Sequence, residues 1–181
     1  LITATAQRQS RRIFDLIVWT LRSNPELMSY IRVQDVGSTL TNINTGTRLI
    51  ATPADPAKLW GMSPSVVLSD EAHAWTGSKG HKLWNSLITG QGARPNPLWA
   101  ILTTGPDAPP NADDLFAEQL KYAWAVESGD IDDRRYLPMI WVCPEDADTT
   151  DEKVWAQYNP GLGFSLTPEE LQEEYERATQ S

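Results

Sequence analysis

Two adjacent carboxylates, Asp70 and Glu71, directly follow the apolar run Ser65-Val66-Val67-Leu68-Ser69. A short, partly β-branched run of this kind is typical of a strand buried on both faces of a sheet. Because successive residues at a strand end point in different directions, one carboxylate can hold a divalent cation while the other polarises a water molecule for attack on a phosphate. An acidic turn between strand and loop would show the same two residues, so the pair alone leaves both interpretations open.

Hydroxyl side chains follow a second apolar run, Leu98-Trp99-Ala100-Ile101-Leu102, which also predicts a buried strand. Thr103, Thr104 and Gly105 then lie at the carboxyl edge of the expected sheet, where open α/β sheets bind ligands. Hydroxyls at this place can sense a terminal phosphate through hydrogen bonds. An ordinary turn is the alternative, since Thr and Gly both favour turns. Because two strands both end in such residues, a site that binds phosphate is favoured over the interpretation of both strand ends as ordinary turns.

Other groups give no comparable signal. The sequence contains no G-x-x-x-x-G-K-S/T phosphate-binding loop, and the nearest stretch, Gly77–Lys82, has the wrong spacing, so we expect a mobile loop there. His73 and His81 are too few for a zinc site. Cys143 lies in an apolar run and is expected to pack in the core. The eight Trp residues are likewise interpreted as packing residues.

The elements that position these residues begin with a strand over residues 1–6 and a helix over Gln7–Ser23, which together form half of a βαβ unit. Residues 31–51 predict a hairpin around the turn Asn44-Thr45-Gly46. Further helices are expected over His81–Thr89 and Asp113–Ser128, and a third apolar strand over Tyr136–Cys143. The fold class that follows is α/β, with a mainly parallel sheet.

The C-terminal part is acidic and polar over Pro144–Glu152, where we place a domain edge or lid. Two short helices follow, the second with Thr167 as its N-cap, Pro168 at its first position and Glu170 three residues after the cap. We therefore divide the chain into a core at residues 1–143 and lid or linker helices at 144–181.

Composition excludes several classes. The 181 residues carry a net charge of -9, which argues against wrapping nucleic acid by bulk positive charge, so any DNA contact is local or made elsewhere. A single cysteine excludes a disulfide framework and fits a reducing, intracellular setting. No apolar stretch has the length of a membrane span, and no signal-peptide pattern opens the chain. Leu1 opens a strand already under way, so we expect an excerpt of a longer protein.

Seven short stretches follow one another in a distinctive order along the chain: Gln7–Phe14, Asn24–Leu27, Leu59–Ser65, Asp70–Glu71, Arg94–Leu98, Leu102–Gly105 and Trp155–Gly163. This order resembles that of the ATPase domain of phage terminase large subunits. The resemblance covers nearly the whole chain, and the Asn-Pro-Gly-Leu-Gly stretch at Asn159–Gly163 makes it fairly specific.

That resemblance implies a three-layer P-loop NTPase fold of the RecA/ASCE-like kind, here incomplete at the N-terminus. In the family a P-loop precedes the segment that Leu1 begins and a nuclease domain follows. Asp70 is then the Mg²⁺ carboxylate and Glu71 the catalytic base, with ATP as the nucleotide. Thr103, Thr104 and Gly105 form the motif that couples hydrolysis to movement. Arg94 either faces a phosphate in its own or a neighbouring subunit or is a solvated loop arginine. Asn159 either belongs to the linker between the ATPase and the nuclease or serves helix-linker packing.

The implied function is ATP-driven packaging of viral DNA into procapsids, in the cytoplasm of an infected bacterium. The implied partners are double-stranded DNA, the portal protein, the small terminase subunit and further copies of the motor in a ring. Two alternatives stay open. Asp70-Glu71-Ala72-His73 is also the signature of a helicase group, and a non-catalytic binding module or remnant would need no P-loop.

Overall fold

A six-stranded, mainly parallel sheet forms the centre of the computed structural model, which describes residues 1–105, 114–144 and 146–179. Its strand order is β2-β3-β4-β1-β5-β6. The strands are β1 (Ile2–Ala4), β2 (Ile31–Gln34), β3 (Thr39–Asn42), β4 (Arg48–Pro53), β5 (Val66–Asp70) and β6 (Leu98–Ile101).

Strands β4, β1, β5 and β6 run parallel to one another, and β2 and β3 add an antiparallel extension beside β4. The predicted turn at Asn44–Gly46 joins β3 to β4, so the hairpin prediction is confirmed. Both predicted strands that precede the candidate site residues are also present. The predicted α/β fold with a mainly parallel sheet is therefore confirmed.

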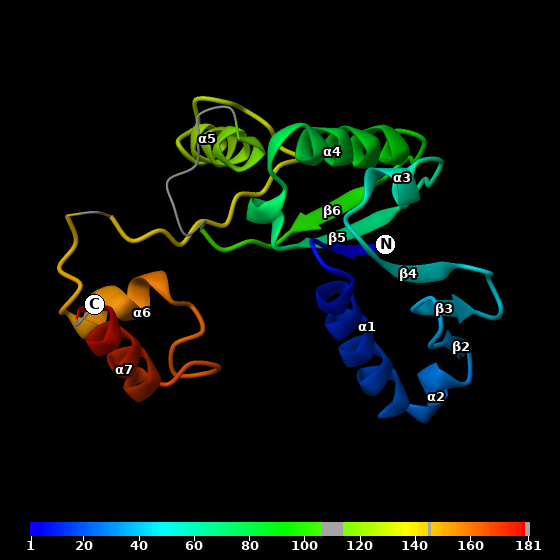
Figure 1. Cartoon of the computed structure of the whole chain (residues 1–181), viewed down its shortest axis with the longest axis horizontal. Helices are drawn as coiled ribbons and strands as arrows, with labels where there is room; N and C mark the ends of the chain where they lie inside the picture. Colours follow the sequence, from blue (N-terminus) through cyan, green and yellow to red (C-terminus); the bar gives the residue numbers. More distant parts are fainter. Residues whose placement is uncertain (106–113, 145, 180–181) are drawn as a thin grey trace. The chain divides into compact units, whose positions relative to one another are not determined.

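Helices cover both faces of this sheet (Figure 1). Helix α1 packs Phe14 and Val18 against one face, and α4 packs Leu83 and Leu87 against the other, where Val67 of β5 meets them. The helices are α1 (Gln7–Arg22), α2 (Pro25–Met28), α3 (Pro56–Leu59), α4 (Gly77–Gln91), α5 (Leu115–Glu127), α6 (Glu152–Tyr158) and α7 (Pro168–Thr179), with a 3₁₀ turn η1 (Ala72–Ala74).

The chain divides into two compact units, Leu1–Tyr122 and Ala123–Ser181. The first contains the whole sheet and its covering helices, and the second contains α6 and α7. This division by compactness falls inside α5. The division that we predict between residues 143 and 144 concerns function rather than compactness, and it stays a prediction.

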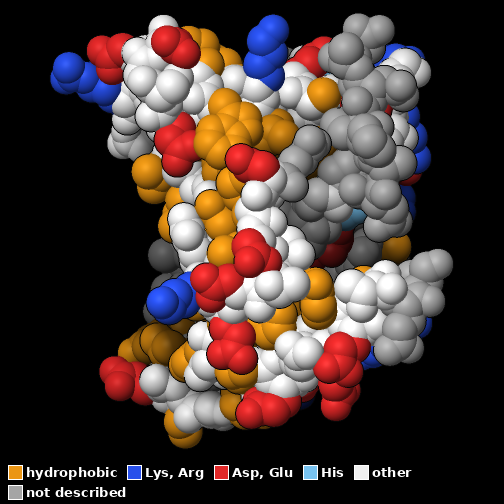
Figure 2. All heavy atoms as spheres, turned by 90° about the vertical axis from the view of Figure 1, so that its left-hand side faces the viewer, with side chains coloured by type: hydrophobic (Ala, Val, Ile, Leu, Met, Phe, Trp, Pro, Cys, Tyr) orange, Lys and Arg blue, Asp and Glu red, His pale blue; other side chains and the backbone are white. Residues whose placement is uncertain are grey.

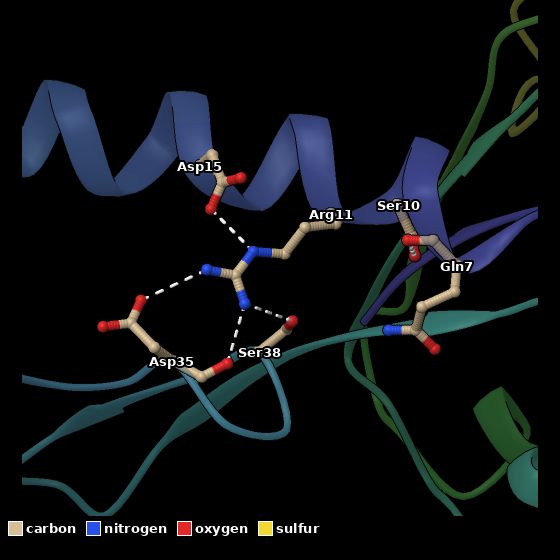
Figure 3. A network of polar contacts seen from close by, with 6 residues as sticks. All are labelled: Gln7, Ser10, Arg11, Asp15, Asp35 and Ser38. Carbon is tan, nitrogen blue, oxygen red and sulfur yellow. Dashed lines mark hydrogen bonds and ion pairs between the residues drawn. The ribbon is translucent and has the colours of Figure 1, made fainter.

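Arg11 ties α1 to the turn between β2 and β3 (Figure 3). Its Nη1 atom donates to the Asp35 carbonyl oxygen at 2.7 Å and lies 3.2 Å from the Ser38 hydroxyl, and its Nη2 atom lies 3.2 Å from Asp35 Oδ1. Within α1, the Nε atom pairs with Asp15 at 2.7 Å. The planar guanidinium thus uses its donors in several fixed directions at once, which a lysine cannot do.

The stretch Gly77–Lys82 is the first part of α4, so the prediction of a mobile loop there is wrong. Its glycines have two different roles: Gly77 has a positive φ of 59°, and Gly80 allows close packing. A Cβ atom built on Gly80 would lie 2.6 Å from the carbonyl carbon of Trp75, so only glycine allows the helix to approach this backbone. The predicted helix at His81–Thr89 is confirmed but begins earlier.

Tyr136–Cys143 forms no strand among the described residues, so that prediction is wrong as well. A strand needs a neighbouring backbone to bond to. No described strand pairs with this segment, and Leu137, Met139, Trp141 and Val142 are exposed. Cys143 is also exposed rather than packed in the core.

The predictions for the remaining elements are mostly confirmed. Helix α5 covers the expected region, although the predicted start at Asp113 lies outside the described residues.

Among the Trp residues, Trp75 and Trp155 are buried and Trp84 packs on Trp99, as expected of packing residues. The interpretation fails for others, which are well exposed: Trp19, Trp60, Trp124 and Trp141.

In the second unit, α7 begins with the predicted capping box. The Thr167 backbone N–H donates to Glu170 Oε2 at 2.8 Å, and the Glu170 N–H donates to the Thr167 hydroxyl at 3.2 Å. Five glutamates lie on α7, and exposed Asp and Glu side chains are coloured red in Figure 2. Among the described residues, no helix has the length and apolar character needed to cross a bilayer.

Candidate active site

The carboxyl ends of β1, β5 and β6 meet at one edge of the sheet because the three strands are parallel and in register. Ala4 lies opposite Asp70, and Ser69 lies opposite Ile101. Thr5, Glu71 and Thr103, which come just after these strands, are therefore brought to the same edge. This is the arrangement that the sequence predicts for Asp70, Glu71 and Thr103.

Glu71 has a left-handed backbone conformation, with φ 55° and ψ 44°. For a residue with a Cβ atom this conformation costs roughly 1–2 kcal/mol and needs support from its surroundings. The Glu71 carbonyl oxygen accepts from the Ala74 N–H at 3.1 Å and from the Thr5 hydroxyl at 3.4 Å. These bonds turn the chain from β5 into η1, so that Glu71 leaves the line of the strand directly after Asp70.

The side chains of Glu71 and His73 and the hydroxyl of Thr103 form a compact cluster at this turn. His73 Nδ1 lies 3.2 Å from Glu71 Oε2 and 3.1 Å from Thr103 Oγ1. The His73 backbone N–H donates to the same hydroxyl at 2.9 Å. The Glu71 and His73 side chains are 33% and 23% exposed, so water reaches both. His73 thus links Glu71, directly after β5, to Thr103, two residues after β6.

The rest of the predicted coupling motif is less constrained. The Thr104 carbonyl oxygen accepts from the Thr103 hydroxyl at 3.0 Å. Gly105 is exposed, and a Cβ atom added there would meet nothing within 4 Å. The conformation of this chain therefore does not require glycine at position 105.

Arg94 lies at the opposite end of the strands. It precedes β6, and its Nε atom donates to the Ser63 carbonyl oxygen at 2.6 Å, just before β5 begins. Arg94 therefore does not join Asp70, Glu71 and Thr103 at their edge of this sheet. A role toward a neighbouring subunit stays a prediction.

A magnesium ion is compatible with the residues at this edge. Among the described residues no cluster of three or more His, Cys, Asp or Glu side chains is present, so an all-protein metal cage is not formed there. Mg²⁺ does not need one, because it is commonly held by one or two carboxylates together with substrate phosphates and water. Asp70, half-buried at the end of β5, supplies a carboxylate of this kind.

The largest groove described on the first unit does not include the candidate site residues. A groove of about 820 Å³ runs between residues 56–63 and the second half of α4, but Asp70, Glu71 and Thr103 do not line it. Groups beyond those at the edge would have to hold most of a triphosphate there.

Two residues at this edge are not among the site residues that the sequence predicts. The sequence places His73 in a helicase-like signature and offers too few histidines for a zinc site, and it gives Thr5 no role. The signal for His73 was its position two residues after Glu71, where a sharp turn can bring the two side chains together. For Thr5 the signal was its position directly after a parallel strand.

The sheet order and the two helix layers define the class of this chain, a three-layer α/β fold with the candidate site at the carboxyl edge of parallel strands. The structure matches the crystal structure of the HK97 bacteriophage large terminase with a TM-score of 0.82 and 23% sequence identity. The match covers 99% of this chain and 36% of that one, so the chain spans about a third of its neighbour's length.

Sequence comparisons add no family assignment. No family model matches the chain, and no curated protein matches it. At 23% identity the structural match establishes the fold. The chain therefore shares its fold with part of a phage large terminase, as the resemblance in its motifs implies.

Proposed function

We propose that this chain is the part of a phage large-terminase ATPase that carries the catalytic carboxylates and the coupling motif. The observation that carries the proposal is the link between the ends of β5 and β6, where His73 Nδ1 lies 3.2 Å from Glu71 Oε2 and 3.1 Å from the hydroxyl of Thr103, which is distant in sequence. The match to the HK97 large terminase supports the same fold and a terminase-like role.

The proposed roles follow from position. Asp70, at the last residue of β5, holds Mg²⁺, which, when bound with ATP, neutralises charge on the phosphates. Glu71, turned out of the strand and open to water, accepts a proton from the attacking water as general base. The segment Thr103–Gly105 changes conformation when the terminal phosphate is lost and so couples ATP hydrolysis to movement of the motor. A P-loop, which this sequence lacks, supplies the main phosphate contacts.

In this proposal the full-length protein packages double-stranded viral DNA into procapsids in the cytoplasm of an infected bacterium. It works as a ring of copies with the portal protein and the small terminase subunit, and Arg94 faces a phosphate of a neighbouring copy. The acidic surface of this chain indicates that DNA is gripped locally or by other segments.

The test is ATP binding and hydrolysis by the full-length protein. Glu71→Gln removes the base but keeps the shape, so turnover falls by roughly 10²- to 10⁴-fold while ATP binding persists. Asp70→Asn weakens Mg²⁺-dependent binding as well. Glu26→Gln, at an exposed glutamate of α2, is the isosteric control and leaves both unchanged. Near-normal turnover in Glu71→Gln removes the proposed base.

A further inference from the structure

The Thr103 hydroxyl has three hydrogen-bond partners, one for its proton and two for its lone pairs. It accepts from the His73 backbone N–H at 2.9 Å, and its own proton is directed to the Thr104 carbonyl oxygen at 3.0 Å. His73 Nδ1 is the third partner, at 3.1 Å. With the single hydroxyl proton on the Thr104 carbonyl oxygen, Nδ1 takes the donor role in this contact.

Glu71 favours the same arrangement. Its Oε2 atom lies 3.2 Å from His73 Nδ1. A proton on Nδ1 attracts the carboxylate, whereas a lone pair on Nδ1 would repel it. Two independent neighbours, the hydroxyl and the carboxylate, therefore both select the imidazole form that carries its proton on Nδ1.

From this geometry we propose that His73 is a positioning residue that makes the placement of the Glu71 carboxylate depend on the conformation of Thr103 and Thr104. The expected effect on ATP turnover rests on the proposed function, whereas the hydrogen-bond arrangement around His73 does not. When the backbone at Thr104 moves, the Thr103 hydroxyl loses its acceptor and turns its proton toward Nδ1. The imidazole then can no longer donate there, and Glu71 loses the group that holds its side chain beside the turn.

The structural test uses the full-length protein labelled with ¹⁵N-histidine, with the His73 signals assigned by their loss in His73→Asn. We expect the neutral ring to carry its proton on Nδ1. Glu71→Gln and Thr103→Val each increase the fraction with the proton on Nε2. Thr104→Val is the matched control, because only the backbone carbonyl of Thr104 takes part, and it leaves the ratio of the two forms unchanged. A ring protonated mainly on Nε2 in the unaltered protein overturns the inference.

The kinetic test separates positioning from simple loss of structure. His73→Ala lowers kcat for ATP roughly 10- to 100-fold, the usual effect of losing one hydrogen bond to a charged group, with KM nearly unchanged. His73→Asn, whose amide lies near the place of Nδ1–H, retains most of the activity. In a Thr103→Val background, His73→Ala causes little further loss because the link is already broken. Independent, multiplicative losses in the double variant contradict the proposal.

The two tests distinguish failure of the inference from failure of the proposed function. If the unaltered full-length protein does not hydrolyse ATP, the proposed function fails and the ¹⁵N experiment alone decides the role of His73. If it does hydrolyse ATP but the proton is on Nε2 and His73→Ala has normal kcat, the ATPase stands and the positioning role is wrong.

Discussion

The indole Nε1 atom of Trp99 on β6 donates a 2.8 Å hydrogen bond to the hydroxyl of Ser69 on β5. Ser69 is fully buried and directly precedes Asp70. The same indole ring packs on Trp84 of α4, with ring centroids 4.4 Å apart. One residue therefore joins both strands of the candidate site to the helix that covers them.

Ser69→Ala should loosen this part of the sheet. The change leaves the Trp99 N–H half-buried without its acceptor, which costs about 1–3 kcal/mol. Hydrogen exchange of the β5 and β6 amides in the full-length protein, which reports the local free energy of opening, is the measurement. Ser65→Ala, at an exposed position just before β5, is the control and should change this free energy by less than about 0.5 kcal/mol. Equal protection in both variants would mean that the indole bond adds nothing.

Arg11→Met should free the turn between β2 and β3. It removes three contacts to Asp35 and Ser38 and leaves the Asp35 carbonyl oxygen without this donor. We expect hydrogen-exchange protection of the turn to fall by about 1–2 kcal/mol, with Arg11→Lys in between because an ammonium cannot donate in all these directions. Arg12→Met is the control, at an exposed position one residue along α1. A turn unaffected by Arg11→Met would show that strand pairing alone holds it.

The elements that the sequence predicts correctly are those whose signals are local. The apolar spacing in Gln7–Ser23 and the capping residues Thr167 and Glu170 depend only on near neighbours, and both elements form as expected. The start of α4 could not be predicted in this way. The composition of Gly77–Lys82 alone favours a loop. Gly80 is required there because the helix contacts the backbone of Trp75, a contact that the local sequence does not reveal.

The remaining errors concern partners that are distant in sequence. Tyr136–Cys143 has the composition of a strand, but composition does not supply the second backbone that a strand needs. His73 and Thr103 are 30 residues apart and meet only because β5 and β6 pair in register. The sequence could predict the two strand ends separately, whereas their connection through one imidazole required the structure.

Replacing both Thr103 and Thr104 with Val should separate hydrolysis from movement. Valine keeps the shape of threonine but lacks the hydroxyl, so the link from His73 to Thr103 is lost while Asp70 and Glu71 remain. In the full-length protein we expect ATP hydrolysis to persist in part and DNA translocation to fail. Both activities are measured on the same preparation. Equal loss of the two would indicate a catalytic or folding defect instead.

The N-terminus of α7 should weaken in acid. Hydrogen bonds from the Thr167 backbone N–H and then from the Thr167 hydroxyl lower the pKa of Glu170 below its ordinary value. A carboxyl with a lowered folded-state pKa stabilises the fold above the unfolded value, about 4.3 for glutamate, and the contribution disappears as pH falls through the folded-state pKa. A ¹³C carboxyl titration should show Glu170 titrating below other exposed glutamates. Thr167→Val keeps the backbone hydrogen bond and removes only that of the hydroxyl, so the pKa of Glu170 should return part of the way toward them; no change would contradict the capping role of the hydroxyl.

The last prediction concerns residues 1–181 as a purified chain, which should hydrolyse no ATP measurably and should self-associate. The sequence lacks the phosphate-binding loop, and Asp70 and Glu71 alone repel a triphosphate.

Self-association should occur through β6, because this strand has one neighbour, β5, among the described residues, and Leu98, Ile101 and Leu102 are exposed along it. An exposed apolar edge is a template for pairing with a second copy. Ile101→Lys places a charge on the edge and should shift the chain toward monomer in analytical ultracentrifugation. Val36→Lys, at a 97% exposed residue between β2 and β3, tests added charge alone and should leave association unchanged. If the chain is monomeric without either substitution, the edge has been assigned wrongly. If it releases phosphate from ATP in the presence of Mg²⁺, and Glu71→Gln abolishes this release, the nucleotide site has been assigned wrongly.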